Sequence, residues 1–248
     1  MRIGIIGVGN IGATLTQRLS EHGHDVKVAN SRGPHTIPAE LLTAGARAVE
    51  ATDVVTDVDA LIISVPLARV PELRPLVDRL PDDAVVLDTS NYYPARDGHI
   101  AAIDEGQVES LWVAERLGGR RVVKAWNAIL SSSFRSHASA PGEPGRIAVP
   151  VAADRDEDRA VGTALVEDTG FEGLDAGTLA DSWRQQPGTP AYCTDLTGPE
   201  LRTALAAAVP GRGPRRRDLA MTVLTELMDD GTERGDDFFV QANRLLYS

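Results

Sequence analysis

Short apolar runs alternate with longer amphipathic stretches along most of the chain. The apolar runs are bounded by turn residues and predict buried strands. They lie at Arg2–Ile6, Asp25–Ala29, Ala46–Val49, Ala60–Val65, Ala84–Asp88, Val122–Trp126, Arg146–Ala152 and Phe171–Asp175. The fourth run, ALIISV, is apolar nearly throughout, which is typical of a strand that helices cover on both faces.

The amphipathic stretches, with apolar residues three or four positions apart, predict helices. They lie at Ile11–His22, from Pro66 to about Leu80, at Val108–Leu117 and at Asp156–Thr169. Strands that alternate with helices favour a parallel sheet with helices on both faces. We therefore expect an α/β fold, a Rossmann doubly wound and mostly parallel sheet.

The pattern changes after about residue 180. The segment 181–197, DSWRQQPGTPAYCTDLT, has no clear periodicity but contains aromatic residues, which predicts an ordered loop rather than a flexible linker. Three helices are expected beyond it, at Pro199–Ala208, Arg215–Met228 and Asp236–Tyr247, with a turn at Pro210–Pro214. We therefore divide the chain into a Rossmann domain over residues 1–180 and an ordered loop with a small C-terminal helical extension over 181–248.

A glycine-rich motif joins the first strand to the first helix. Its residues are Gly7, Val8, Gly9, Asn10, Ile11 and Gly12. A GxGxxG sequence is weak evidence alone, but between a strand and a helix it indicates a dinucleotide site. The first glycine permits a tight turn, the second lets a pyrophosphate approach the backbone, and the third lets helix and strand pack closely. The N-terminus of the helix then offers free N–H groups to the phosphates.

The end of the second strand predicts which dinucleotide binds. A site specific for NAD places a carboxylate there, on the ribose 2′-hydroxyl. This chain has Asn30, followed by Ser31 and Arg32. Neutral donors and a guanidinium suit a 2′-phosphate, so we expect NADP(H), with His35 as a possible further contact.

Ligands of a doubly wound sheet lie beyond the carboxyl ends of the strands. Three more segments follow predicted strands, and they contribute the candidates Ser64, Val65, Pro66, Asn91 and Asn127. Val65 and Pro66 could form an apolar wall beside the ribose or nicotinamide. The two asparagines could bind the carboxamide or the hydride acceptor, or could simply cap the following turns.

Composition narrows the classes of partner. Hydrophobic residues make up 42% of the 248 residues, which excludes a wholly disordered chain. A net charge of −11 argues against nucleic acid as a partner. No run approaches the ~20 apolar residues of a membrane span. We expect a cytoplasmic protein with a small-molecule substrate or redox cofactor.

Metal and cysteine chemistry are not expected. Cys193 is the sole cysteine, and His22 and His24 stand only two positions apart at a helix end, where side chains do not share a face. Lysine occurs only at Lys27 and Lys124. Lys124 could act as an acid if it pointed into the cleft, but a lysine paired with a carboxylate is the commoner arrangement.

Several of these segments resemble the deazaflavin-dependent NADP reductases, the coenzyme F-420:NADP oxidoreductase family. The matching elements are MRIGIIGVGNIG at the start, NSRGP at 30–34, SVP at 64–66, DTSN at 88–91, VVKAWNAI at 122–129 and VPVAAD at 149–154. The resemblance covers about residues 1 to 180. The chain departs from it at 33–36, GPHT, where archetypal members carry a further basic residue, and in its longer tail.

The resemblance implies that Gly7–Gly12 holds NADP, that Ser31 and Arg32 contact its 2′-phosphate, and that hydride passes directly between the nicotinamide and coenzyme F-420. No dedicated general acid is then required, and Asn127 is at most a weak catalytic candidate. Two alternatives stay open: an NADPH-dependent imine or carbonyl reductase, and a non-catalytic NADPH-binding redox sensor. A homodimer through the C-terminal helices is expected.

Overall fold

The structure, a computed structural model, describes residues 1–228 and 234–247. Its described residues form one sheet of eight strands. The strands are β1 Arg2–Ile6, β2 Asp25–Ala29, β3 Arg47–Ala48, β4 Ala60–Ile63, β5 Val85–Asp88, β6 Val122–Lys124, β7 Ala148–Ala153 and β8 Glu172–Asp175. Every predicted strand is present, with bounds shifted by a few residues at most.

The strand order is β3-β2-β1-β4-β5-β6-β7-β8. The pairs from β3 through β6 are parallel, and β7 pairs antiparallel with β6. This confirms the mostly parallel Rossmann sheet. Because β7 runs antiparallel to β6, it begins at the edge of the sheet where β6 ends. The carboxyl edge of β1, β4, β5 and β6 is therefore the edge that carries the candidate residues.

Ten α-helices and four 3-10 helices are present in the described residues. The α-helices are α1 Asn10–Glu21, α2 Arg74–Val77, α3 Pro94–Asp97, α4 Ala101–Asp104, α5 Glu109–Arg116, α6 Ser131–Ser136, α7 Asp156–Asp168, α8 Gly198–Ala207, α9 Arg212–Met228 and α10 Asp236–Tyr247. The 3-10 helices are η1 Pro34–Thr36, η2 Ala39–Leu42, η3 Leu67–Leu73 and η4 Leu179–Gln185.

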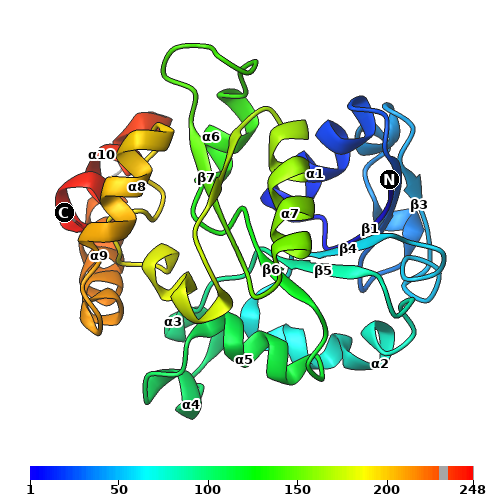
Figure 1. Ribbon diagram of the computed structural model, residues 1–248, viewed down its shortest axis with the longest axis horizontal. Coiled ribbons are helices and arrows are strands. Elements are labelled where there is room, and N and C mark those ends of the chain that lie inside the picture. Colours follow the sequence, from blue (N-terminus) through cyan, green and yellow to red (C-terminus); the bar gives the residue numbers. More distant parts are fainter. Residues whose placement is uncertain (229–233, 248) are drawn as a thin grey trace.

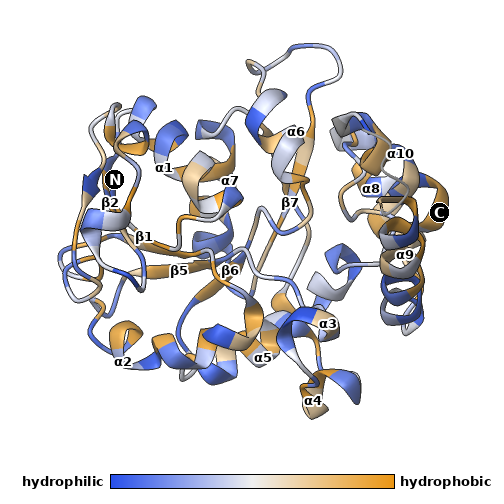
Figure 2. Ribbon diagram, turned by 180° about the vertical axis from the view of Figure 1, so that it is seen from behind, coloured by the Kyte–Doolittle hydropathy of each residue, from blue (hydrophilic) through white to orange (hydrophobic). Residues whose placement is uncertain are grey.

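Helices cover both faces of the sheet (Figure 1): α1, α6 and α7 lie on one face, and α2 and α5 on the other. The strands supply side chains to both layers in alternation. Ile62 of β4 belongs to the same buried cluster as Leu15 of α1, whereas its neighbours Leu61 and Ile63 belong to a second cluster with Val113 of α5. In Figure 2 the strands are mostly hydrophobic, and the helices beside them carry both hydrophobic and hydrophilic residues. A fully apolar run such as β4 is thus explained by burial on both sides.

The prediction of one continuous α-helix between Pro66 and Leu80 is wrong. The segment is the 3-10 helix η3 followed by the single α-turn α2. Pro71 lies inside η3 and Pro75 inside α2. Each proline lacks an N–H and its ring crowds the preceding turn, so the i→i−4 ladder cannot run through this segment.

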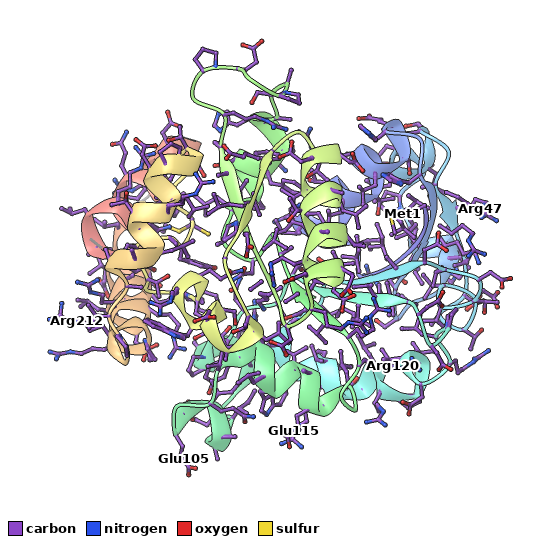
Figure 3. The ribbon with its side chains drawn as sticks, viewed as in Figure 1. Met1, Arg47, Glu105, Glu115, Arg120 and Arg212 are labelled. Carbon is purple, nitrogen blue, oxygen red and sulfur yellow. The ribbon has the colours of Figure 1, made fainter. Side chains whose placement is uncertain are left out.

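The helices α8, α9 and α10 gather at the end of the molecule opposite the N-terminus (Figure 1). Figure 3 shows Arg212, at the start of α9, and Met1 on opposite sides. The turn expected at Pro210–Pro214 is shorter than predicted, because α9 already begins at Arg212. Pro214 is tolerated there since the N–H groups of a first helical turn have no intrahelical partner. None of the described helices is long and apolar enough to cross a membrane.

Candidate functional site

The glycine motif forms a tight turn between β1 and α1. Gly7 has a φ of 106°, and a Cβ there would lie 2.1 Å from the carbonyl oxygen of Ser64. A Cβ at Gly12 would lie 2.1 Å from the carbonyl oxygen of Gly7. Both positions therefore require glycine for packing, and together they bring the start of α1 against the end of β4.

Gly9 differs from these two glycines because no atom lies within 4 Å of the place its Cβ would take. It is the N-cap of α1, it is exposed, and no side chain caps the helix. The first N–H groups of an uncapped helix have no intrahelical acceptor and favour an anion. The turn therefore leaves open space above Gly9 beside the free N–H groups of α1, as the binding of a pyrophosphate requires.

Asn30 shapes the loop after β2. Its Oδ1 accepts a hydrogen bond from the backbone N–H of Arg32 at 2.9 Å, and its Nδ2 donates to Oγ1 of Thr36 at 2.9 Å. The amide is therefore used within the loop, in the way of an Asx turn. Ser31 and Arg32 are exposed, and among the described contacts the guanidinium of Arg32 has no hydrogen bond or salt bridge. The loop leaves both side chains available to a ligand.

The segment after β4 lies directly beside the glycine turn. The backbone N–H of Ser64 donates to the carbonyl oxygen of Ile6 at 2.8 Å, which extends the β1–β4 pairing to the edge. Ser64 and Val65 are half-buried and Pro66 is exposed. Val65 also packs against the core on the α5 side. The structure thus brings this predicted segment next to the open turn at Gly9.

The two candidate asparagines bind each other. Nδ2 of Asn127 donates to Oδ1 of Asn91 at 3.1 Å, and Nδ2 of Asn91 donates to the carbonyl oxygen of Asn127 at 2.8 Å. Asn127 is 2% exposed and also exchanges hydrogen bonds with Gln185: its Nδ2 donates to the backbone carbonyl at 2.9 Å, and its Oδ1 accepts from Nε2 at 2.8 Å. Both amide protons of Asn127 are therefore taken, so a direct donor role toward a ligand requires rearrangement.

Trp126 precedes Asn127 and adopts a left-handed backbone, with φ of 55°. Non-glycine residues rarely occupy this region, at a cost of about 1–3 kcal/mol, and such residues cluster at functional sites. Trp126 is 1% exposed, and its indole N–H donates to Oγ1 of Thr169 at 3.2 Å. The buried ring holds the turn that places Asn127 beside Asn91 and Gln185.

Lys124 forms a buried ion pair with Asp88. The Nζ atom lies 2.6 Å from Oδ2 of Asp88, it also donates to the carbonyl oxygen of Ser90, and both charged side chains are 0% exposed. This is the paired arrangement that sequence reasoning favoured for Lys124. The pair links the ends of β5 and β6 and does not present a free ammonium to the cleft.

Three further polar residues lie around these strand ends. Sequence reasoning missed Gln185 and Glu109, whereas Ser90 belongs to the segment after β5 that it had nominated. Gln185 lies 58 positions beyond Asn127, and no local pattern could have joined them. The hydroxyl of Ser90 is buried and has no partner among the described residues. Glu109 begins α5 and is 3% exposed, and burial raises the pKa of its carboxyl from 4.5 to about 7. In sequence it is one acidic residue among 36.

Comparison with known proteins supports the family resemblance. Residues 2–92 match the model of a family described as NADP oxidoreductase, coenzyme F-420-dependent. The Escherichia coli protein YjhV is 44% identical over 75 residues, which are 30% of this chain and 55% of YjhV. The match therefore spans about half the length of that relative.

Solved structures share the fold. The hypothetical protein SMa0349 from Sinorhizobium meliloti is 26% identical, with a TM-score of 0.62 over 75% of this chain and 89% of that chain. A protein proposed to be an F-420-dependent NADP reductase, from Arthrobacter sp. FB24, is 18% identical, with a TM-score of 0.59 over 73% of this chain and 87% of that chain. The fold that this chain shares with the two structures therefore covers much more of the chain than residues 2–92.

Proposed function

We propose that this chain transfers hydride between NADP(H) and coenzyme F-420. The match of residues 2–92 to the coenzyme F-420-dependent NADP oxidoreductase family supports this proposal. The observation that carries the nucleotide half of this proposal is the open space above Gly9 at the uncapped N-terminus of α1. The family match supports the second cofactor. The same match also supports the broader function of an NADP-dependent oxidoreductase, whatever the hydride acceptor.

The chain's own residues would bind and orient the nucleotide. The backbone N–H groups of the Gly7–Gly12 turn would hold the pyrophosphate, and Ser31 and Arg32 would hold the 2′-phosphate. Val8, Asn10 and Ile11 would complete the turn. Ser64, Val65 and Pro66 would line the nicotinamide half, with Asn30 shaping the loop and with Asn91 and Asn127 setting the far wall.

NADP(H), when bound, supplies or accepts the hydride at its nicotinamide ring. The protein's contribution to such an exchange is to hold two rings face to face and to exclude water, since proximity and orientation supply most of the rate. The pairing of Lys124 with Asp88 is consistent with a reaction that needs no free lysine acid.

Spectrophotometry tests the proposal directly. The protein is mixed with NADPH and oxidised coenzyme F-420, with NADH as the parallel control. We expect loss of the deazaflavin absorbance with NADPH and much slower loss with NADH. No loss with either nucleotide, while NADPH still binds by fluorescence, would overturn the deazaflavin assignment. It would redirect the search to imine or carbonyl acceptors or to a redox sensor.

The boundary near residue 180 and a homodimer are also part of the proposal. All strands end by Asp175, and the helices α8, α9 and α10 follow. Large apolar side chains are exposed on α9, including Leu219 and Met228, which is a feature of association surfaces. We expect Leu219→Asp to convert a dimer to a monomer in sedimentation equilibrium. A wild-type protein that sediments as a monomer at all concentrations would contradict this.

A further inference from the structure

A cavity of about 890 Å³ lies between α9 and the segment that leads from the end of β5 to the start of α5. Its walls come from the segment after β5, from the start of α5, from η4 and from α9, so it joins the two parts of the chain. Six residues define its character: Tyr93, Ile103, Glu109, Trp183, Arg217 and Met221. The volume is within the range of sites for small organic molecules.

This cavity is separate from the proposed nucleotide site. None of the residues of the Gly7–Gly12 turn lines it, and neither do Ser31 and Arg32 or the segment Ser64–Pro66. A ligand in this cavity would therefore not touch these nucleotide-site residues, and its binding can be measured without a nucleotide.

Glu109 is the most deeply buried acid of the cavity wall. Its Oε2 accepts a hydrogen bond from the backbone N–H of Tyr92 at 3.0 Å, and no described contact is made by its Oε1. A carboxylate that is 3% exposed with one backbone hydrogen bond is incompletely compensated. It therefore needs a proton or a cation from the cavity side.

The cations near Glu109 are already paired with other acids. Lys124 of β6 binds Asp88 of β5 at 2.6 Å, and Nε of Arg217 on α9 binds Asp218 at 2.7 Å. Arg217 also donates to the carbonyl oxygen of Tyr92 at 3.3 Å. Both cations lower the pKa of Glu109, yet burial, with help from Asp88, outweighs them and raises it to about 7. No salt bridge to Glu109 is present among the described residues.

The rest of the wall agrees with a cationic guest. Three acids line the cavity, Asp104, Glu109 and Asp218, against the single arginine Arg217 and the exposed His99. Aromatic and aliphatic side chains from both parts of the chain supply much of the remaining lining, together with four polar residues, Gln107, Gln186, Thr189 and Thr222. A ligand with a positively charged head and an apolar body matches this distribution of charge and surface.

We propose that this cavity binds a small organic amine, with its ammonium group on the free oxygen of Glu109 and its apolar body against Trp183 and Met221. The site is built by residues from both sides of position 180. A ligand in this cavity would therefore contact α9 as well as the start of α5.

Three indoles that share one ring and differ in their head group test the charge that the cavity selects. They are tryptamine, tryptophol and indole-3-acetate, which carry a cationic, a neutral and an anionic head. Isothermal titration of the full-length protein at about pH 8, without nucleotide, measures each affinity. We expect tryptamine to bind at least about tenfold more tightly than either analogue. Preference for indole-3-acetate, equal affinities, or no binding by any of the three would overturn the proposal.

Variants locate the contact. Glu109→Gln keeps the shape of the side chain and removes its charge, and we expect it to weaken tryptamine binding at least about tenfold while affinity for tryptophol changes little. Glu105→Gln is the control, because Glu105 directly follows α4, is exposed and is not among the residues that line the cavity. Figure 3 shows Glu105 at the lower edge of the molecule. Equal tryptamine affinity in Glu109→Gln and the wild type would show that the ammonium does not lie on Glu109.

The pH dependence gives a second readout. Because only ionised Glu109 attracts the ammonium, tryptamine affinity should fall several-fold from about pH 8 to about pH 6 in the wild type and stay flat in Glu109→Gln. A flat wild-type profile would contradict the assigned contact. The nucleotide assay is separate from this titration, so either proposal can fail without the other.

Discussion

At the scale of single residues, Arg32 is the side chain on which the choice of nucleotide depends. It is exposed, and its guanidinium makes no hydrogen bond or salt bridge among the described residues. Its backbone N–H is held by Asn30 at 2.9 Å, so the loop is ordered while the side chain stays available. A group in this state can bind a 2′-phosphate without first losing a partner.

We expect Arg32→Ala to raise the Kd for NADPH roughly 10- to 150-fold and to leave the Kd for NADH nearly unchanged. The reason is that a charge-assisted hydrogen bond contributes about 1.5–3 kcal/mol, and only NADPH carries the 2′-phosphate. Fluorescence titration measures both constants. Arg47→Ala is the control, since exposed Arg47 pairs with Asp25 at 2.6 Å. Equal losses for the two nucleotides would exclude the 2′-phosphate contact.

Glu109 gives a residue-scale prediction for stability. Burial raises the pKa of its carboxyl from 4.5 to about 7 in the folded chain. A raised pKa means that the folded state holds the proton more tightly than the unfolded state. Its contribution is therefore fully present below about pH 4.5 and is lost as pH rises through about 7, a change of about 3 kcal/mol.

Glu109→Gln cannot titrate at this position, so it should gain stability relative to the wild type across that window. Urea unfolding at a series of pH values measures the difference in the free energy of unfolding. We expect the difference to grow by about 3 kcal/mol between pH 4.5 and 8. Two curves that stay parallel would show that Glu109 is not a buried carboxyl of raised pKa.

At the scale of elements, two glycines of the turn between β1 and α1, Gly9 and Gly12, differ in the space around them. A Cβ at Gly12 would lie 2.1 Å from the carbonyl oxygen of Gly7, whereas one at Gly9 would meet nothing within 4 Å. The fold therefore explains the glycine at position 12. It does not explain the one at position 9, where the proposed binding of a pyrophosphate would.

Gly9→Val should abolish the binding of both NADPH and NADH while the thermal midpoint stays close to that of the wild type. Gly12→Ala should instead lower the free energy of unfolding by about 1–3 kcal/mol or more, because the backbone must shift to admit the new methyl group. Calorimetry and nucleotide titration on the same two proteins give both readouts. Tight nucleotide binding by Gly9→Val would remove the phosphate role of this turn.

At the scale of the whole molecule, Gln185 connects the C-terminal part of the chain to the sheet edge. The side-chain amide of Gln185 donates to Oδ1 of Asn127 at 2.8 Å, and the backbone carbonyl oxygen of Gln185 accepts from Nδ2 of Asn127 at 2.9 Å. Asn127 in turn binds Asn91 after β5. A buried network of this kind fixes the end of η4 against β5 and β6.

We expect Gln185→Ala to lower the free energy of unfolding by about 1–3 kcal/mol, because it leaves the buried Oδ1 of Asn127 without its donor. Chemical denaturation measures the change. The matched control is Gln107→Ala, since Gln107 binds only exposed Glu115, at 3.1 Å. If both variants lost the same small amount, the network would not contribute to holding the two parts together.

The sequence by itself determined the strand positions, the Rossmann class and the glycine turn. Their causes are local: apolar runs, helical periodicity and the backbone freedom of Gly7 act within a few residues. It also located the loop Asn30–Arg32, since a strand end carries the neighbouring residues with it. The helix expected after Pro66 failed for an equally local reason, because Pro71 and Pro75 interrupt it.

Only the tertiary structure decided the rest. The reversal of β7, the pairing of Asn127 with Gln185 and the burial of Glu109 beside a cavity depend on contacts between segments far apart in the chain. Nothing within a few residues of Asn127 specifies a partner 58 positions away. Nor does the composition around Glu109 tell an exposed helix start from a buried one. Burial and long-range hydrogen bonding follow from how layers pack, so these features exist only once the sheet and the C-terminal helices have met.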